Sequence, residues 1–281
     1  TYGIMHISSQ DGDQLSMNVI LVYPLFPTTF WSFQYALRFI GKKAALPPLG
    51  LLTVAQLLPS SWKLRVIDMN VIRLRKKDLD WADAVMISAM VVQQDSAREV
   101  IARAGAAGKT VIAGGPAFTC EPEKYPGVDH LVLGEAERSL PPFLEDFGKG
   151  VAKPRYDAGQ FPQMHEVPNP RWDLLDMRKY ASMSIQFSRG CPFNCDFCSV
   201  TALFGHRPRI KSAQQIVTEL DSIWAQGWRN SVFFVDDNFI GNKRFLKNEL
   251  LPELIIWQKA HKRGLPFYTE SSINLADDPE L

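Results

Sequence analysis

Short apolar runs alternate with helical patterns along the first half of the chain. The expected strands cover residues 18–23, 64–68, 84–88, 110–113 and 130–133. Apolar runs of this length predict buried strands, and the apolar periodicity from residue 96 to 107 predicts a helix between two of them. Five short strands that alternate with helices indicate an α/β fold with a doubly wound parallel sheet. Such sheets bind ligands outside the carboxyl ends of their strands.

The second half of the chain repeats the strand–helix pattern. Residues 183–188 predict a strand that ends at Arg189-Gly190. Ser212, with a glutamine three residues later, predicts the capped start of an apolar-periodic helix. A buried strand over 231–235, a helix over 243–262 and a strand over 267–269 follow. Repeated βα units with polar residues at the strand ends are typical of a parallel barrel.

Three of the four cysteines lie in one loop, between the first strand and the first helix of this second half. Cys191, Cys195 and Cys198 have the spacing C-x3-C-x2-C. Three thiolates can hold three corners of an iron–sulfur cube, which leaves one iron open for chemistry. With His206 they could instead form a closed Cys3His zinc site, although zinc ligands usually come as two separated C-x2-C pairs. Cys120 stands alone, and we expect it to be a spectator.

The string Arg189-Gly-Cys-Pro-Phe-Asn-Cys-Asp-Phe-Cys198 resembles the signature of radical S-adenosylmethionine (SAM) enzymes. The strand before it and the helix after it agree with that family. The resemblance implies that Cys191, Cys195 and Cys198 ligate a 4Fe-4S cluster and that SAM chelates the open iron. It also implies that the backbone around Phe197 lies against the adenine.

Asp236, Asp237 and Asn238 follow the second strand of this half. By the same resemblance, this edge binds the amino group of SAM. A turn and a helix cap also need short polar side chains, so the residues alone leave both interpretations open.

The first sheet has its own candidate ligand site. Ser88 ends the third strand and Gly114-Gly115 ends the fourth, an arrangement similar to the serine and double glycine of cobalamin-binding domains. Those domains often carry a histidine in a D-x-H-x-x-G loop after the first strand, whereas the loop here, Tyr23–Pro27, has none. Two interpretations remain: cobalamin bound without a histidine ligand, or a sheet without a cofactor in which the glycines only form a tight turn.

The order of the two predicted domains resembles that of cobalamin-dependent radical SAM enzymes. Residues 23–24, 30–33, 47–52 and 235–242 are similar to the branch that includes hopanoid C-methylases. This resemblance implies a C-methyltransferase that acts on an unactivated carbon through a 5'-deoxyadenosyl radical. One alternative is a cobalamin-dependent rearrangement or cyclisation without methyl transfer. Another is a non-catalytic iron–sulfur or zinc protein.

We expect four segments in the chain. Residues 1–16 form an irregular leader before an expected native start at Met17, and 17–150 form a cobalamin-binding Rossmann-like domain. Residues 151–180 are a proline-rich linker, and 181–281 are the N-terminal half of a radical SAM barrel. Three barrel strands are predicted where the family usually has six. We therefore expect a fragment, with the SAM ribose contacts and most of the substrate pocket beyond Leu281.

Composition adds limits to these expectations. A hydrophobic content of 46% over 281 residues supports two packed cores, and a formal net charge of +1 gives no reason to expect a nucleic-acid partner. The sequence shows no membrane span and no disulfide framework, and an oxygen-sensitive cluster needs a reducing compartment, so we expect a cytoplasmic protein and leave membrane association open. The resemblance implies a small-molecule or lipid substrate and an electron donor such as a flavodoxin or ferredoxin.

Several charged residues lie near the predicted sites. Arg207, Arg209 and Lys211 could contact an anionic part of SAM or substrate, but a basic segment before a helix is expected to be solvated. Glu270, after the third barrel strand, is a candidate residue at the barrel mouth.

Overall fold

The computed structural model describes residues 16–29, 32–262 and 264–281. The expected leader, residues 1–16, lies almost wholly outside this part of the chain. Phe30 and Trp31, which contribute to the resemblance, lie outside it too.

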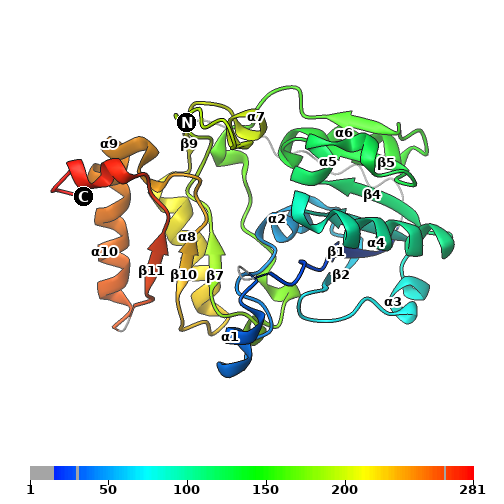
Figure 1. The fold of residues 1–281 in the computed structure, drawn as a ribbon, viewed down its shortest axis with the longest axis horizontal. Coiled ribbons are helices and arrows are strands. Elements are labelled where there is room, and N and C mark those ends of the chain that lie inside the picture. The colour runs from blue at the N-terminus through cyan, green and yellow to red at the C-terminus, as the bar shows by residue number, and fades with distance from the viewer. Residues whose placement is uncertain (1–15, 30–31, 263) are drawn as a thin grey trace.

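Six parallel strands form the first sheet, in the order β2-β1-β3-β4-β5-β6 (Figure 1). They are β1 (Asn18–Tyr23), β2 (Lys63–Asp68), β3 (Ala84–Ser88), β4 (Thr110–Gly114), β5 (His130–Leu133) and β6 (Arg155–Asp157). The predicted doubly wound α/β sheet is confirmed, and its strand order reverses between β1 and β3. Such a switch point leaves a crevice at the carboxyl ends of the strands, where doubly wound sheets bind ligands.

Helices cover both faces of this sheet, because alternate residues of each buried strand point to opposite sides. On β1, Val19 and Leu21 pack in one core, whereas Ile20 and Val22 pack in the other. The helices of the domain are α1 (Gln34–Phe39), α2 (Leu49–Leu57), α3 (Lys76–Trp81), α4 (Gln94–Ala106), α5 (Pro116–Cys120) and α6 (Ala136–Gly148). α2 and α6 supply buried residues to the first core, and α3, α4 and α5 supply them to the second.

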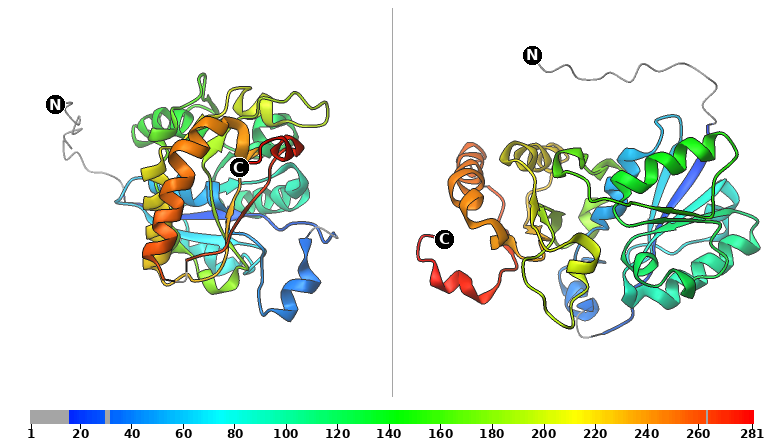
Figure 2. Two further views of the ribbon diagram at one scale, coloured as in Figure 1. Left: turned by 90° about the vertical axis from the view of Figure 1, so that its left-hand side faces the viewer. Right: turned by 90° about the horizontal axis from the view of Figure 1, so that it is seen from above.

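Three parallel strands form the second sheet, in the order β11-β10-β7. They are β7 (Met183–Ile185), β10 (Val232–Phe234) and β11 (Phe267–Thr269). Helix α8 (Ala213–Ala225) precedes β10 in the chain. It begins with the predicted capping box, in which Ser212 Oγ accepts from Gln215 N at 3.2 Å. Helix α10 (Leu251–Ala260) precedes β11 and lies at the end of the molecule away from the first sheet (Figure 2).

Two predicted elements are divided in the structure. The strand expected over 183–188 ends at Ile185, and its continuation β8 (Ser188–Arg189) pairs antiparallel with β9 (Arg209–Ile210). A short helix α7 (Val200–Phe204) lies between β8 and β9. The helix expected over 243–262 consists of α9 (Lys243–Phe245), a π-helical turn at Leu246–Leu250 and α10.

Residues 178–182, which lead from the first domain into β7, are hydrogen-bonded to the first domain. Residues 42–46 run beside residues 178–182, with Lys43 N donating to Lys179 O at 2.8 Å and Ala181 N to Ala44 O at 3.0 Å. The Tyr180 hydroxyl donates to Asp68 Oδ2 at 2.9 Å, at the carboxyl end of β2. These contacts attach the segment to the first sheet immediately before β7 begins.

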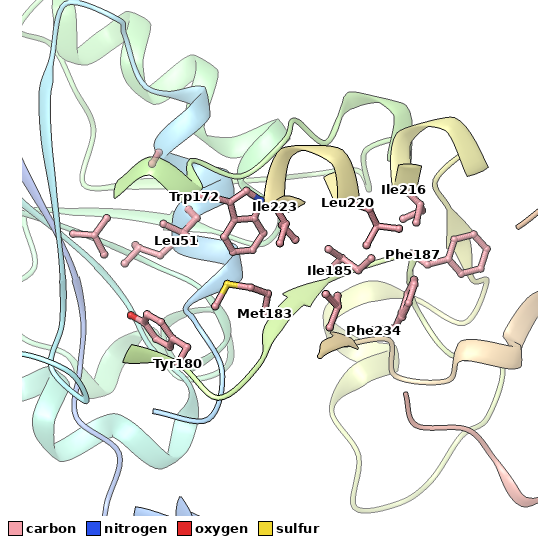
Figure 3. Close-up of a cluster of buried hydrophobic side chains, with 14 of the residues drawn as sticks. Leu51, Trp172, Tyr180, Met183, Ile185, Phe187, Ile216, Leu220, Ile223 and Phe234 are labelled. Atoms are coloured by element: carbon pink, nitrogen blue, oxygen red, sulfur yellow. The ribbon is translucent and has the colours of Figure 1, made fainter. Parts of the chain in front are cut away.

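A single apolar core joins the two sheets (Figure 3). Trp172 lies among Leu51 of α2, Met183 of β7 and Ile223 of α8, and it is 1% exposed. Arg171 N donates to Leu52 O at 3.2 Å and so holds the tryptophan against α2. Burial of one large aromatic ring between elements of both domains fixes how the sheets lie relative to each other.

Within the described residues, no helix combines the length and the apolar character that crossing a membrane requires.

We predict that Trp172→Ala lowers the free energy of unfolding by about 3–5 kcal/mol, because the lost ring leaves a cavity that the core fills only in part. Urea unfolding followed by circular dichroism measures this change. Trp172→Phe keeps most of the apolar volume and should lose clearly less. Equal unfolding midpoints for Trp172→Ala and the unaltered protein would contradict the joining role of this side chain.

Candidate functional site: a cavity between two strand edges

A cavity of about 1640 Å³ lies between the two sheets. The first sheet lines it with Ser88, Gly114 and Gly115, and the second sheet lines it with Ser184 and Asp237. The sequence predicted two sites at two separate strand edges. The structure places residues of both edges around one space, which is large enough for a cofactor together with a substrate.

The cysteine loop leaves the barrel edge between β8 and β9. Cys195, Phe197 and Cys198 are exposed, and Cys191 is half-buried. Cys198 N donates to Cys195 O at 3.0 Å, which forms a tight turn, and Cys191 N donates to Gly205 O at 3.2 Å at the base of the loop. The thiols are therefore accessible on one loop, as a cluster that binds SAM requires.

Gly190 begins this loop and cannot be replaced without strain. Its φ is +95°, and a Cβ atom there would meet the carbonyl oxygens of Gly205 and Arg207 at 2.9 Å. Only glycine adopts this backbone conformation readily and permits the close approach. The glycine thus has a structural role in closing the loop that carries the cysteines.

In the described residues, no group of three or more histidine, cysteine or acidic side chains is already placed to hold a metal ion. His206, the fourth ligand of the zinc alternative, is exposed. The donor set, three thiols on one accessible loop, suits an iron–sulfur cluster, and the thiols would have to converge as the cluster binds.

Asp236 is buried and braces the strand before the cysteine loop. Its carboxylate accepts from Phe187 N at 3.1 Å and from both the backbone N–H and the hydroxyl of Ser188 at 2.5 Å. Burial raises the pKa of the Asp236 carboxyl to about 6, although the hydrogen bonds from Ser188 and Phe187 act in the opposite direction. All three of these hydrogen bonds come from groups of the protein itself.

Asn238 is also buried, but its side chain does not cap a helix. Its Oδ1 accepts from Ser272 N at 3.2 Å and from Ser272 Oγ at 3.3 Å, which links the edges of β10 and β11. Asp237 differs from both neighbours because its side chain is exposed and lines the cavity. Protein atoms around the carboxylate partly desolvate it and so raise the pKa of Asp237, as does the charge of Glu270, whereas a hydrogen bond from the Gly190 backbone lowers that pKa.

Glu270 is exposed beside Asp237, and its carbonyl oxygen accepts from Phe239 N at 3.1 Å. Cys120 lies at the end of α5, is exposed, and is remote in sequence from the cysteine loop.

Ser88 and Gly115 are neighbours at the crevice of the first sheet. Gly115 has a φ of +88°, and a Cβ atom there would lie 2.6 Å from Ser88 Oγ. A Cβ atom on Gly114 would lie 2.5 Å from Val132 O of β5. The double glycine therefore lets β4 pack closely on its neighbours and leaves a flat surface at the strand ends, where a planar cofactor can approach.

The loop after β1 is held without a histidine. Gln93 and Asn70 both donate to Pro24 O, at 2.5 and 3.3 Å, and Asn70 Oδ1 accepts from Phe26 N at 2.9 Å. Leu25, Phe26 and Pro27 line the cavity. The loop thus presents apolar side chains to the space that a cobalamin would occupy.

A buried charge network connects the two domains, and sequence reasoning missed it. Arg189 Nη1 bonds Glu135 Oε2 at 2.5 Å, and Arg209 Nη2 bonds Glu135 Oε1 at 2.5 Å. Glu137 Oε1 accepts from Arg189 Nη2 at 2.9 Å. Burial alone would raise the pKa of Glu137, but Arg189 lowers it below the ordinary value. The acidic residues at the start of α6 were the only sequence signal, and their partners are separated from them by more than fifty residues.

The basic segment before α8 was expected to be solvated, and for two of its three residues this was wrong. Arg209 bonds Glu135, and Lys211 is buried in an ion pair with Glu219. Burial raises the pKa of Glu219, and the charge of Lys211 opposes that rise. Only Arg207 is exposed. Buried carboxylates supply the counter-charges that the sequence could not identify.

Comparison with protein families gives two matches. The model of the B12 binding domain matches residues 43–144, and the model of the radical SAM superfamily matches residues 185–271. The first range holds the Ser88 and Gly114-Gly115 edge, and the second holds the cysteine loop and Asp237.

Curated relatives and solved structures agree with these matches. The chain is 48% identical to an uncharacterised methyltransferase of Synechocystis sp. over 94% of its own length, and 36% identical to the hopanoid C-2 methylase of Rhodopseudomonas palustris over 96%. It covers 50% and 52% of those two proteins, so it spans about half the length of the curated relatives it matches.

The radical SAM methyltransferase TsrM from Kitasatospora setae, solved with tryptophan and a SAM analogue, has a similar fold. The TM-score is 0.63 at 20% identity, over 89% of this chain and 53% of that one. The two family matches, the arrangement of the two sheets and the relatives together show that the chain belongs to the cobalamin-binding radical SAM family.

Proposed function

We propose that this chain is the cofactor-binding part of a cobalamin-dependent radical SAM C-methyltransferase. The observation that supports the proposal is the single cavity lined by both strand edges, because methyl transfer needs the two cofactors and the substrate to share one space. When bound, these cofactors supply a methyl group on cobalt and a 5'-deoxyadenosyl radical that removes hydrogen from an unactivated carbon. The protein positions the groups and excludes water.

Cys191, Cys195 and Cys198 would hold the cluster, with the backbone near Phe197 beside the adenine. Of the three polar residues after β10, Asp237 is our candidate for the SAM amino group, because it alone of them is exposed to the cavity. Asp236 and Asn238 would act indirectly, by holding β8 and β11 in place around it.

Ser88, Gly114 and Gly115 would form the floor on which cobalamin lies. The apolar loop from Leu25 to Pro27 would face the cofactor without offering an imidazole. We propose that the substrate is a small molecule with a large apolar part, in line with the relative that is a hopanoid methylase. An electron donor such as a flavodoxin or ferredoxin would reduce the cluster.

We predict that Cys195→Ala abolishes cluster binding and leaves the first sheet folded. After anaerobic reconstitution with iron and sulfide, iron analysis and electron paramagnetic resonance (EPR) of the reduced protein measure the loss. Cys120→Ala is the matched control and should keep its iron. Full iron content in Cys195→Ala would refute the ligand assignment.

The same EPR experiment tests whether Asp237 belongs to the SAM site. The EPR signal of the unaltered protein should change when SAM is added. Asp237→Ala should keep the cluster signal but show a much weaker response to SAM. A normal response would remove Asp237 from the SAM site.

We predict that Gly115→Ala weakens cobalamin binding by about tenfold or more, because a side chain at this φ is strained and the new Cβ would collide with Ser88 Oγ. Optical titration with cobalamin measures the affinity. The control is Gly105→Ala in α4, where a Cβ meets no atom within 4 Å. Equal affinities in the two variants, with unchanged circular dichroism, would argue against cobalamin at this edge.

The reaction itself is tested with SAM that carries a trideuterated methyl group. We predict that the label appears in a product when the protein with both cofactors and a reductant is incubated with a lipid extract and analysed by mass spectrometry. Label found in methionine alone, beside an altered but unlabelled product, would favour a rearrangement or cyclisation instead.

A further inference from the structure

The cysteine loop has a narrow neck formed by β8 and β9. Arg189 and Arg209 are direct register partners in this antiparallel pair, and they enclose the loop from Gly190 to Pro208. Because the two residues lie opposite each other, whatever holds their side chains also holds both ends of the loop.

One carboxylate holds both of these arginines. The two oxygens of Glu135 each accept from a different guanidinium at 2.5 Å, and Arg209 Nη1 makes a further contact with Glu135 Oε2 at 3.2 Å. The Glu135 side chain is 2% exposed, and those of Arg189 and Arg209 are 11% and 15% exposed. Solvent and salt screen such a buried arrangement weakly, and the forked guanidinium groups define its direction as well as its distance.

Glu135 belongs to the other domain and lies directly at its crevice. It follows Gly134, which comes after β5 and lines the cavity together with Gly115. Gly134 N donates to Thr119 Oγ1 at 3.0 Å, so the backbone beside Glu135 is itself attached to the helix that follows the double glycine. Glu135 also precedes the first turn of α6, where a carboxylate is favourable.

Further contacts hold the two arginines of the neck. Glu137 accepts a second pair of hydrogen bonds from Arg189, at 2.9 and 3.1 Å, and Gln186 Oε1 accepts from Arg189 Nε at 2.9 Å. Arg209 also donates to Pro162 O at 2.8 Å. Arg189 therefore has partners on all three of its nitrogen atoms, which leaves it little freedom to adopt another position.

A buried ion network of this kind is not an efficient way to stabilise a fold. Apolar side chains of similar volume often serve as well or better, whereas charged forks fix one geometry. We propose that Glu135 is a positioning residue, which holds the neck of the cluster loop at a fixed distance from the cobalamin-binding crevice. This inference rests on the proposed function, because it concerns the separation of the two cofactors.

The test measures that separation directly. The reduced cluster and cob(II)alamin both carry an unpaired electron, and their dipolar interaction, seen by EPR, falls with the cube of the distance between them. The protein reconstituted with both cofactors should show one well-defined interaction. Glu135→Gln keeps the shape of the side chain but removes the charge that holds two arginines, so it should give a weaker or broadened interaction at equal iron and cobalamin content.

The matched control is Glu145→Gln on the same helix, which breaks an exposed pair with Lys149. It should leave the interaction unchanged. If Glu135→Gln fails to fold, Arg209→Lys replaces it: this variant keeps the charge but loses the fork, and it should broaden the interaction. An interaction in the folded variant identical to that of the unaltered protein would overturn the inference, as would a broad interaction in the unaltered protein.

The same samples distinguish failure of the proposed function from failure of the positioning role of Glu135. Absence of bound cluster or bound cobalamin in the unaltered protein would sink the proposed function. Both cofactors bound, with a separation that does not depend on Glu135, would sink only the positioning role.

Discussion

The packing of Trp172 and its neighbours between two parallel sheets is the constraint on which the site depends. Both sheets have their candidate ligand edges at strand carboxyl ends, and each edge alone is an open surface. The shared core, with Leu51, Met183 and Ile223 around the tryptophan, turns the edges toward one cavity. A displacement of the core would separate the edges without altering a single residue at either of them.

Buried ion pairs fix the position of the cysteine loop more closely than the apolar core does. Apolar contacts are numerous but not directional, so they bring the two strand edges to one cavity without fixing the position of each loop. The forked contacts of Arg189 and Arg209 with Glu135 are directional and act at the neck of the cysteine loop. Asp236 works in a similar way nearer the barrel, because it ties the strand before the loop to the end of β10. The polar residues near the site therefore divide into those that brace the loop and those, such as Asp237, that are open to the cavity.

Local sequence patterns predicted the parts of the fold that depend on short-range regularity. Five of the six strands of the first sheet and the capped start of α8 follow from periodicity and caps within about ten residues, whereas β6 lies in the segment that was expected to be a linker. The family was indicated by the resemblance of short motif strings. The division of residues 183–188 into β7 and β8 was not predictable, because β8 exists only through pairing with Arg209 and Ile210. Likewise, Asp236, Asp237 and Asn238 are adjacent in the chain but differ in burial, because partners from distant segments decide which of these side chains is buried.

The sequence by itself determined the fold class, through apolar periodicity, and indicated the family, through the resemblance of its motif strings. Gly190 and Gly115 belong to this group, since a positive φ favours glycine whatever surrounds it. Only the tertiary structure decided that residues of the two strand edges line one cavity and that Arg209 and Lys211 are paired rather than solvated. The physical reason is that burial and charge pairing arise between residues far apart in the chain, and no local pattern of residues encodes which of them will meet.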